Sequence, residues 1–462
     1  MARPVKTVRD AVHGDIHLPA EYLPVLDARE MQRLRGVKQL GTAFHVYPSA
    51  RHTRFEHCLG AFHMATRLIA RLRRNHRADP DSAADLTPGE ERIAHLAALT
   101  HDLPHIPYGH SIEDQDGLLP RHDTTERIAR ALGGGEIAAA LDRLGARAEV
   151  EHLLAGPAGL AGPGAGSALR PALRPGVREL VSENVCADLL DYLARDALFT
   201  GLRLAYDDRI LDSLKLDPQS GHLYIDLTKH EMERADVLSE LLNLFRIRYV
   251  CSERIYYHHA KVASGALVSR AVELCLSAGL DPTALDPLTD DELPPLLAAF
   301  AAQHAGDDSR LAAVGHLLER FSARKLLKRA FVAGLAGHEA IQDALVHRFV
   351  ENQPARNAME AEIACALGIA DPAEVIVYCP KKSMQLKEAH ALVRRAGRPL
   401  APLTDYADEF PMLGQMLRDY RYLWKLYVFI PPRERAGMEA AGRRIEGALQ
   451  AHFPAIRNGY RP

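Results

Sequence analysis

The chain has 462 residues, of which 47% are hydrophobic and 25% are charged, so it can bury a large core and form more than one domain. Its 57 basic residues nearly balance its 60 acidic residues. This balance argues against nucleic acid or an anionic membrane as the main partner, and any anionic ligand has to meet a local basic pocket.

Six scattered cysteines and a polar N-terminus predict a cytoplasmic location. No two cysteines form a C-x-x-C pair, which is typical of reduced thiols. The first residues, M-A-R-P-V-K-T-V-R-D, contain no apolar stretch of the signal-peptide type, and no run of 18 apolar residues follows. We therefore expect a cytoplasmic protein that makes no use of a membrane.

Helices are expected over most of the first two thirds of the chain. Apolar residues recur there at helical spacing, and Ala, Leu, Arg and Glu, which are good helix formers, are frequent. Residues 155–176 are so rich in Gly and Pro that they predict a flexible loop, either a lid or, in the simpler interpretation, a surface insertion. The predicted helices cover residues 55–72, 90–100, 123–132, 178–199, 232–276 and 310–335.

Strand-like runs are few and short, at residues 223–227, 375–379 and 426–430. The last two are rich in β-branched and aromatic residues, and each is followed directly by a proline. A helical segment separates them. They predict a small α+β module at the C-terminus.

Two segments concentrate the side chains that bind metals or move protons. The motif R-F-E-H occupies residues 54–57, and H-D-L-P-H-I-P-Y-G-H-S-I-E occupies residues 101–113. An adjacent His-Asp pair followed by two more histidines has no obvious use in packing a core. Neighbouring residues on a helix point about 100° apart, so the pair can share one ion only where helix geometry loosens, which Pro104 and Pro107 predict. We expect metal or catalytic chemistry here.

A further metal ligand has to come from a distant element, because a metal held by nitrogen and carboxylate atoms needs three or four converging side chains. The best candidate segment is E-N-V-C-A-D-L-L-D-Y-L-A-R-D at residues 183–196. As a helix, it places Asn184, Asp188, Asp191 and Arg195 on one narrow polar stripe. Such a stripe is ordinarily solvated, but the upstream His-Asp motif favours a ligand-bearing face.

These motifs resemble the HD-domain superfamily of metal-dependent phosphohydrolases, most closely its deoxynucleoside triphosphate triphosphohydrolase branch, which includes the sterile-alpha-motif-and-HD-domain enzyme. Three more segments look like the same branch in register: R-D-A-V-H-G-D-I-H-L-P, R-L-R-G-V-K-Q-L-G-T-A-F-H-V-Y-P and R-Y-V-C-S-E-R-I-Y-Y-H-H. The resemblance covers about residues 5–280. It implies a mainly α fold, with an HD-domain helical bundle at 1–280, a helical extension at 281–370 and the α+β module at 371–462.

The resemblance also implies roles for individual residues. The metal ligands would be His57, His101, Asp102 and Asp188. The catalytic positions would be His110, His105 and His122, with Glu113 orienting a neighbouring imidazole. The substrate-binding positions would be Arg54, Gln39, Leu40, Tyr192, Asp196, Arg248 and Tyr256.

The chemistry of these residue types suits the implied roles. A divalent metal polarises a phosphoryl oxygen or activates water, and histidine can exchange a proton at neutral pH. Arginine offers planar forked donors for phosphate oxygens, and tyrosine can stack on a sugar or bind it through a hydrogen bond. An isolated histidine, by contrast, is usually a helix residue, and His105 is equally well explained as a group that supports a ligand.

Two departures from the family pattern bear on the substrate. Pro104 stands where a glycine usually follows the His-Asp pair and the next apolar residue. Leu189 stands where the triphosphohydrolase branch often has a lysine, so one phosphate-binding charge is missing. A nucleotide phosphomonoesterase or phosphodiesterase, with a second metal on the extra histidines, therefore remains an alternative. A non-catalytic nucleotide sensor is another.

Our prediction is hydrolysis of a deoxynucleoside triphosphate to a nucleoside and triphosphate. The expected cofactor is a divalent transition metal, namely iron, manganese, nickel or zinc, with Mg²⁺ at the substrate phosphates as a further candidate. The partners implied by the resemblance are a nucleotide substrate and further copies of the chain in a homo-oligomer.

Overall fold

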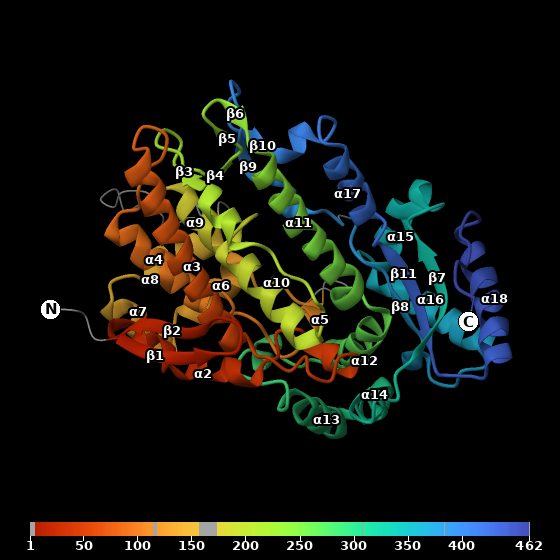
Figure 1. The fold of residues 1–462 in the computed structure, drawn as a ribbon. Helices are drawn as coiled ribbons and strands as arrows, with labels where there is room; N and C mark the ends of the chain where they lie inside the picture. Colours follow the sequence, from red (N-terminus) through yellow and green to blue (C-terminus); the bar gives the residue numbers. More distant parts are fainter. Residues whose placement is uncertain (1–4, 114–117, 157–172, 307, 383, 462) are drawn as a thin grey trace.

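The computed structural model describes residues 5–113, 118–156, 173–306, 308–382 and 384–461, which form a mainly α-helical protein (Figure 1). A β-hairpin opens the chain, and a series of helices follows it. These first elements are β1 (Val5–Asp10), β2 (Gly14–Pro19), α1 (Leu23–Leu26), α2 (Arg29–Arg33), α3 (Arg54–Ala78), α4 (Pro88–Thr100), α5 (His110–Glu113), α6 (Thr125–Leu132), α7 (Gly135–Arg143), α8 (Arg147–Ala155), α9 (Pro175–Ser182) and α10 (Ala187–Thr200).

The rest of the chain mixes short strands with helices. In Figure 1, α11 crosses the middle of the molecule between the N-terminal helices and the C-terminal sheet. The elements are β3 (Leu214–Leu216), β4 (Leu223–Asp226), β5 (Thr228–Lys229), β6 (Met232–Glu233), α11 (Ala235–Cys251), α12 (His259–Ser277), α13 (Leu293–His304), α14 (Ala312–Ser322), β7 (Lys328–Gly334), α15 (Gln342–Phe349), α16 (Gln353–Leu367), β8 (Ile376–Tyr378), β9 (Leu392–Arg394), β10 (Ala401–Pro402), α17 (Pro411–Arg421), β11 (Lys425–Ile430) and α18 (Arg435–Gln450).

Capping boxes fix the starts of α3 and α4, two helices that pack against each other. The backbone N–H of Thr53 donates to the carboxylate of Glu56 at 2.6 Å, and the Thr53 hydroxyl accepts from the Glu56 backbone. Thr87 and Glu90 make the same pair of bonds at the start of α4. Because each box satisfies backbone donors that a helix start leaves open, both helices begin at defined residues.

Helix α10 lies directly against α3 because Gly60 carries no side chain. A Cβ atom at this position would overlap the side chains of Asp191 and Arg195. Both side chains are fully buried at the contact. The close approach of the two helices brings the polar side of α10 to the first turn of α3.

The helices predicted at 55–72, 90–100 and 123–132 are confirmed as α3, α4 and α6. The predicted helix 178–199 is interrupted between α9 and α10, where Asn184 takes a positive φ of 43° and Cys186 caps α10 with its sulfur. The prediction for 232–276 is also too long. It begins in β6, and a π-helical turn at Ser252–Tyr256 separates α11 from α12.

The prediction of helix at 310–335 is wrong beyond α14. Arg324 takes a positive φ of 54°, and residues 328–334 form strand β7. This strand pairs antiparallel with β11, placing Phe331 opposite Val428. Pairing with a distant strand outweighs the local helix propensity of this segment.

The predicted α+β module is confirmed, and its sheet has the strand order β7-β11-β8. A second sheet, with the order β10-β9-β4-β3, pairs β4 in parallel with β9 of the C-terminal part. Strand pairing therefore crosses the boundaries that we expected at residues 280 and 370. The division into three units stays a prediction.

The predicted loop at 155–176 begins where α8 ends and overlaps the start of α9, and its residues 157–172 lie outside the described part of the chain. All six cysteines lie inside that part and carry free thiols. Among the described residues, none of the helices has an apolar stretch long enough for a membrane crossing.

Candidate metal centre and active site

The four predicted metal ligands converge between α3, α4 and α10. The Nε2 atom of His57 lies 3.1 Å from Nε2 of His101 and 2.9 Å from Oδ1 of Asp188. Asp102 reaches the same point, with its Oδ2 at 3.9 Å from His57 Nε2 and its Oδ1 at 3.6 Å from His101 Nε2. The structure thus brings together side chains that are far apart in the sequence, the most distant being His57 and Asp188.

Helix ends place these side chains. His57 lies in the first turn of α3 and Asp188 in the first turn of α10, directly after the sharp bend at Asn184. His101 and Asp102 follow the last residue of α4, and His101 still has helical dihedrals and donates its N–H to the carbonyl of Ala97. Directly after the pair, the N–H groups of Leu103 and His105 bond three residues back instead of four, so the helix geometry changes at the end where the prolines predict it.

A half-buried arginine and a buried one hold the turn that follows the His-Asp pair. Arg33 Nη2 donates to the carbonyl oxygens of Leu103 and His105, both at 2.9 Å. Arg127 Nη2 donates to the carbonyl of Pro104. Pro104 has no backbone N–H to offer, but its carbonyl oxygen becomes one of the anchors of the turn.

The donor set fits a divalent metal. Nδ1 of His57 lies 2.7 Å from Asp191 Oδ2, and Nδ1 of His101 lies 2.9 Å from the carbonyl oxygen of Ala98. These acceptors take the Nδ1–H of each ring, so each imidazole turns Nε2 toward the other ligands. Metal-binding histidines usually have such a partner for the second ring nitrogen.

The charge of the cluster also suits a cation. Burial alone lowers the pKa of His57, but the hydrogen bonds that its ring donates to Asp188 and Asp191 outweigh burial and raise that pKa to about 10. Burial would raise the pKa of Asp188, and its contacts with His101 and His57 reverse this and lower it. The carboxylates are thus ionised, and a metal ion would compete with a proton for His57.

The cluster is open on one side. The Asp188 side chain is 29% exposed, whereas those of His57 and Asp102 are buried. The predicted catalytic residue His110 is 42% exposed. Solvent therefore reaches one predicted ligand, Asp188, and one predicted catalytic group, His110.

Glu113 is the centre of a second cluster, formed by the predicted catalytic histidines. Its Oε2 lies 3.0 Å from Nδ1 of His122, 3.1 Å from Nδ1 of His105 and 3.9 Å from Nδ1 of His110. Arg127 pairs with the other oxygen at 3.2 Å. Burial alone raises the pKa of Glu113, but these histidines hold it well below its usual range. The carboxylate therefore holds His122 through a hydrogen bond and pairs electrostatically with His105.

His105 joins the two clusters. Its Nε2 lies 3.3 Å from Asp102 Oδ1, while its Nδ1 faces Glu113. Its ring stacks on that of His122, with the centroids 3.7 Å apart. The ligand atoms of His105, His110 and His122 lie close enough together to hold a metal. However, both ring nitrogens of His105 already face carboxylates, so the geometry favours a bridging role for it over ligation of a second ion.

Arg54 is buried beneath the first cluster. Its Nη1 donates to Asp102 Oδ2 at 2.7 Å. The predicted phosphate-binding guanidinium is thus engaged with a predicted metal ligand. Gly109 leaves room for it, because a Cβ there would meet Arg54 Nη2, and its φ of 44° also favours glycine.

Four of the other predicted substrate-binding residues come together beside the cluster. The guanidinium of Arg248 lies over the rings of Tyr192 and Tyr256, at 5.4 and 5.0 Å from their centroids. The Tyr256 hydroxyl donates to Asp196 Oδ2 at 2.7 Å. The Tyr192 and His57 ring centroids are 6.5 Å apart, so this group adjoins the metal centre.

Gln39 and Leu40 lie in the loop that leads to α3. The backbone N–H of Gln39 donates to the carbonyl oxygen of His52 at 3.0 Å, and Leu40 is buried in the main core. His52 Nε2 lies 2.8 Å from Asp196 Oδ1. The loop is therefore tied to the substrate-binding group through His52, which our sequence analysis did not assign.

Two further contributors were missed. Asp191 lay on the predicted polar stripe, but the sequence did not show that it would be buried under His57. Glu388 comes from the C-terminal part, and its Oε1 accepts from Arg248 Nε at 2.9 Å. No sequence motif marks Glu388, because its partner lies 140 residues earlier.

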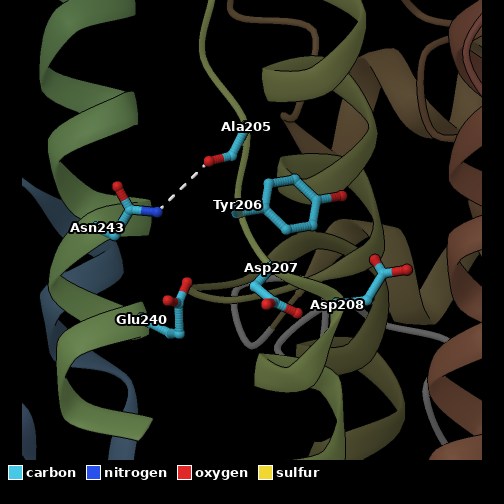
Figure 2. A pocket seen from close by; sticks show the side chains of 6 residues that line it. All are labelled: Ala205, Tyr206, Asp207, Asp208, Glu240 and Asn243. Carbon is cyan, nitrogen blue, oxygen red and sulfur yellow. Dashed lines mark hydrogen bonds between the residues drawn. The ribbon is translucent and has the colours of Figure 1, made fainter. Parts of the chain in front are cut away.

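Two surface hollows lie away from these residues. Figure 2 shows one of about 580 Å³ between α11 and the segment after α10, lined by Ala205, Tyr206, Asp207, Asp208, Glu240 and Asn243. Another, of about 670 Å³, lies next to it and reaches the hairpin turn at His13. Neither is lined by any residue that the sequence predicted for the site.

Two family models match separate parts of the chain. A family model described as the HD domain matches residues 54–196, which contain all four converging ligands. A second model, described as the HD associated region, matches residues 243–449. The chain belongs to the HD-domain superfamily. This HD-domain protein carries Arg248 and Glu388 in its associated region.

Several curated proteins are similar to the chain. One is the deoxynucleoside triphosphate triphosphohydrolase SAMHD1 homolog of Dictyostelium discoideum, 28% identical over 55% of this chain and 46% of its own length. SAMHD1 of Gallus gallus is 27% identical over 55% of this chain and 43% of its own. An uncharacterized protein of Methanocaldococcus jannaschii is 27% identical over 58% of this chain and 49% of its own. The chain spans about half the length of these relatives.

Solved structures share the fold over nearly the whole chain. A hypothetical protein from Aquifex aeolicus superposes with a TM-score of 0.65 at 20% identity, covering 96% of this chain and 100% of its own. A phosphohydrolase from Bacteroides thetaiotaomicron gives a TM-score of 0.61 at 19% identity, covering 93% of this chain and 100% of its own. The associated region is thus part of the shared fold.

Proposed function

We propose that the protein is a metal-dependent phosphohydrolase that cleaves a deoxynucleoside triphosphate into a nucleoside and inorganic triphosphate. The observation that carries the proposal is the convergence of His57, His101, Asp102 and Asp188 beside the group of Tyr192, Arg248 and Tyr256. The similarity to SAMHD1 relatives that are named deoxynucleoside triphosphate triphosphohydrolases supports it.

The four ligands would hold a divalent metal, which supplies Lewis acidity toward a phosphoryl oxygen. Arg248 would bind phosphate oxygens from the side of the tyrosines. Tyr192 and Tyr256 offer ring faces and hydroxyl groups to a sugar, and the hydrogen bond to Asp196 fixes the orientation of Tyr256. The substrate would therefore lie between the metal centre and α11.

His110 would exchange the proton at the leaving oxygen. It is the most exposed of the three clustered histidines, with 42% of its side chain exposed against 17% for His122 and 1% for His105. Glu113 and His122 lie behind it, and the ring centroids of His110 and His122 are 5.0 Å apart. An imidazole supported by a buried carboxylate can donate and recover a proton at neutral pH.

A nucleotide phosphomonoesterase or phosphodiesterase is the second candidate, because little positive charge is free for three phosphates. Leu189 replaces a frequent lysine, Arg54 pairs with Asp102, and Arg248 pairs with Glu388. A triphosphate would have to displace Glu388 or share Arg248 with it. A substrate with fewer phosphate charges would need less displacement of Glu388 from Arg248.

A substrate panel separates these candidates. Metal-free protein would be loaded in turn with Fe²⁺, Mn²⁺, Ni²⁺ or Zn²⁺ and given nucleoside tri-, di- and monophosphates and cyclic nucleotides, with the products separated by chromatography. Intact triphosphate and a nucleoside support the proposed reaction. Orthophosphate or opening of a cyclic phosphate supports the second candidate, and nucleotide binding without turnover with any metal supports a sensor.

A further inference from the structure

A closed ring of hydrogen bonds links the N-terminal hairpin to helix α10. The Asp10 carboxylate at the end of β1 accepts from the backbone N–H groups of Val12 and His13, both at 2.9 Å. The His13 side chain then reaches Asp191, with Nε2 at 2.6 Å from Oδ1. Arg195 closes the ring by donating to both carboxylates, at 2.9 to 3.2 Å.

The ring is attached to the metal centre at a single atom. Asp191 Oδ2 lies 2.7 Å from Nδ1 of His57, on the side of the imidazole away from the other ligands. The side chains of Asp191 and Arg195 are completely buried, and that of His13 is almost so. Since His13 and Arg195 hold Asp191 through three hydrogen bonds besides the one to His57, Asp191 cannot rotate without breaking several bonds.

We infer that Asp191 and His13 are positioning residues for the metal ligand His57, and that the hairpin turn locks the metal in place. Asp191 orients the His57 ring through its Oδ2 atom. His13 binds the other oxygen, Oδ1, and so holds the Asp191 carboxylate in place. The inference rests on the metal centre proposed above but not on the choice of substrate. Residues that hold a metal-binding histidine in this way typically contribute a factor of about 10 to 100 in metal affinity.

The conformation of the hairpin turn directs the His13 side chain toward Asp191. Gly14 follows His13 with a φ of 74°, a conformation that other residues rarely adopt, so the chain reverses directly after His13. The ring of His13 also stacks on that of His63 on α3, with the centroids 4.8 Å apart. His13 lines the hollow of about 670 Å³, so a shorter side chain enlarges an existing space instead of opening a new one in the core.

The test is binding of Co²⁺ to metal-free full-length protein, measured by competition with a chelator and by the Co²⁺ absorption spectrum. His13→Ala is expected to weaken Co²⁺ binding about tenfold and Asp191→Asn about 10- to 100-fold, with altered spectra. His13→Gln keeps a donor for Asp191 and should bind near the wild-type level. His17→Ala, on the exposed face of the same hairpin, is the matched control and should bind Co²⁺ at the wild-type level.

The outcomes separate the inference from the proposed function. Failure of the wild-type protein to bind Co²⁺ removes the metal centre and the inference with it. Wild-type affinity in both His13→Ala and Asp191→Asn overturns the inference alone. Equal losses in His13→Gln and His13→Ala overturn it too, because the hydrogen bond would not be the cause. Unchanged thermal midpoints of the metal-free His13 variants show that lost affinity does not arise from unfolding.

Discussion

Asp102 faces groups from three directions within the site. Its oxygens lie 3.6 Å from His101 Nε2, 3.3 Å from His105 Nε2 and 2.7 Å from Arg54 Nη1. Burial alone would raise the pKa of Asp102, but Arg54 and the two histidines hold it well below its usual range. A change in Asp102 would therefore disturb metal binding and proton transfer together, so other residues have to separate the two roles.

Asp188 tests metal binding alone. Asp188→Ala is expected to lose the metal on desalting while keeping its fold, because this side chain is the most exposed of the four ligands. Metal content by elemental analysis and circular dichroism check this, with the exposed Asp207→Ala as the control. Full metal occupancy in Asp188→Ala would remove Asp188 from the ligand set.

His110 tests proton transfer alone. His110→Ala should keep the metal and lower kcat by a factor of about 10² to 10⁴, the usual contribution of a general acid or base. Steady-state kinetics on the best substrate of the panel measures the change, with the exposed His152→Ala on α8 as the control. Near wild-type turnover would show that another group moves the proton.

At the scale of elements, the start of α4 is tied to the start of α9 by one carboxylate. Glu90 closes the capping box with Thr87 and also accepts from Arg174 Nε at 2.7 Å. Burial alone raises the pKa of Glu90, but the hydrogen bonds from Arg174 and Thr87 lower it to about 2. Glu90 thus stabilises the starts of α4 and α9.

Glu90→Gln should reveal this contribution through its pH dependence. A carboxyl whose pKa is lower in the folded state stabilises fully above its unfolded value of about 4.5, and the stabilisation fades as pH falls toward 2. The variant should be less stable at pH 7 by about 1–2 kcal/mol, and the difference should shrink at pH 3. Urea unfolding at both pH values measures it, with the exposed Glu126→Gln as the control. A difference independent of pH would contradict the assignment.

The sequence predicted the elements and ligands whose signal is local. Regular apolar spacing predicted α3 and α4, and the resemblance of the motifs to the HD-domain superfamily predicted His57, His101, Asp102 and Asp188 as metal ligands, side chains that the structure brings together. The sequence could not reveal β7, because only β11 makes residues 328–334 a strand. Nor could it reveal Asp191 as a partner of His57, since that contact depends on Gly60 letting α10 approach α3.

At the scale of the whole molecule, sheets join parts of the chain that the sequence suggested were separate. Strand β7 pairs with β11, and β4 pairs with β9. The main hydrophobic core likewise includes residues of α3 and of α18. The chain should therefore fold as one cooperative unit.

Truncation after residue 370 tests this expectation. The shortened chain would expose the edges of β4 and β7 and the apolar side chains beneath them, so we expect it to aggregate. Size-exclusion chromatography of residues 1–370, beside calorimetry of the full chain, provides the measurement. A monodisperse 1–370 protein with a wild-type thermal midpoint would show that the C-terminal module is dispensable for folding.

The bond between Arg248 and Glu388 has a consequence for how such proteins diverge. One partner lies on α11 and the other in the module that follows α16, yet both border the proposed substrate. A recombinant in which residues 371–462 are exchanged for those of a relative would bring its own partner, or none, to Arg248. Such an exchange would change the net charge that Arg248 and its partner present to the phosphates, while every residue of the matched HD domain stayed the same. Exchange of the C-terminal part would therefore alter substrate selectivity.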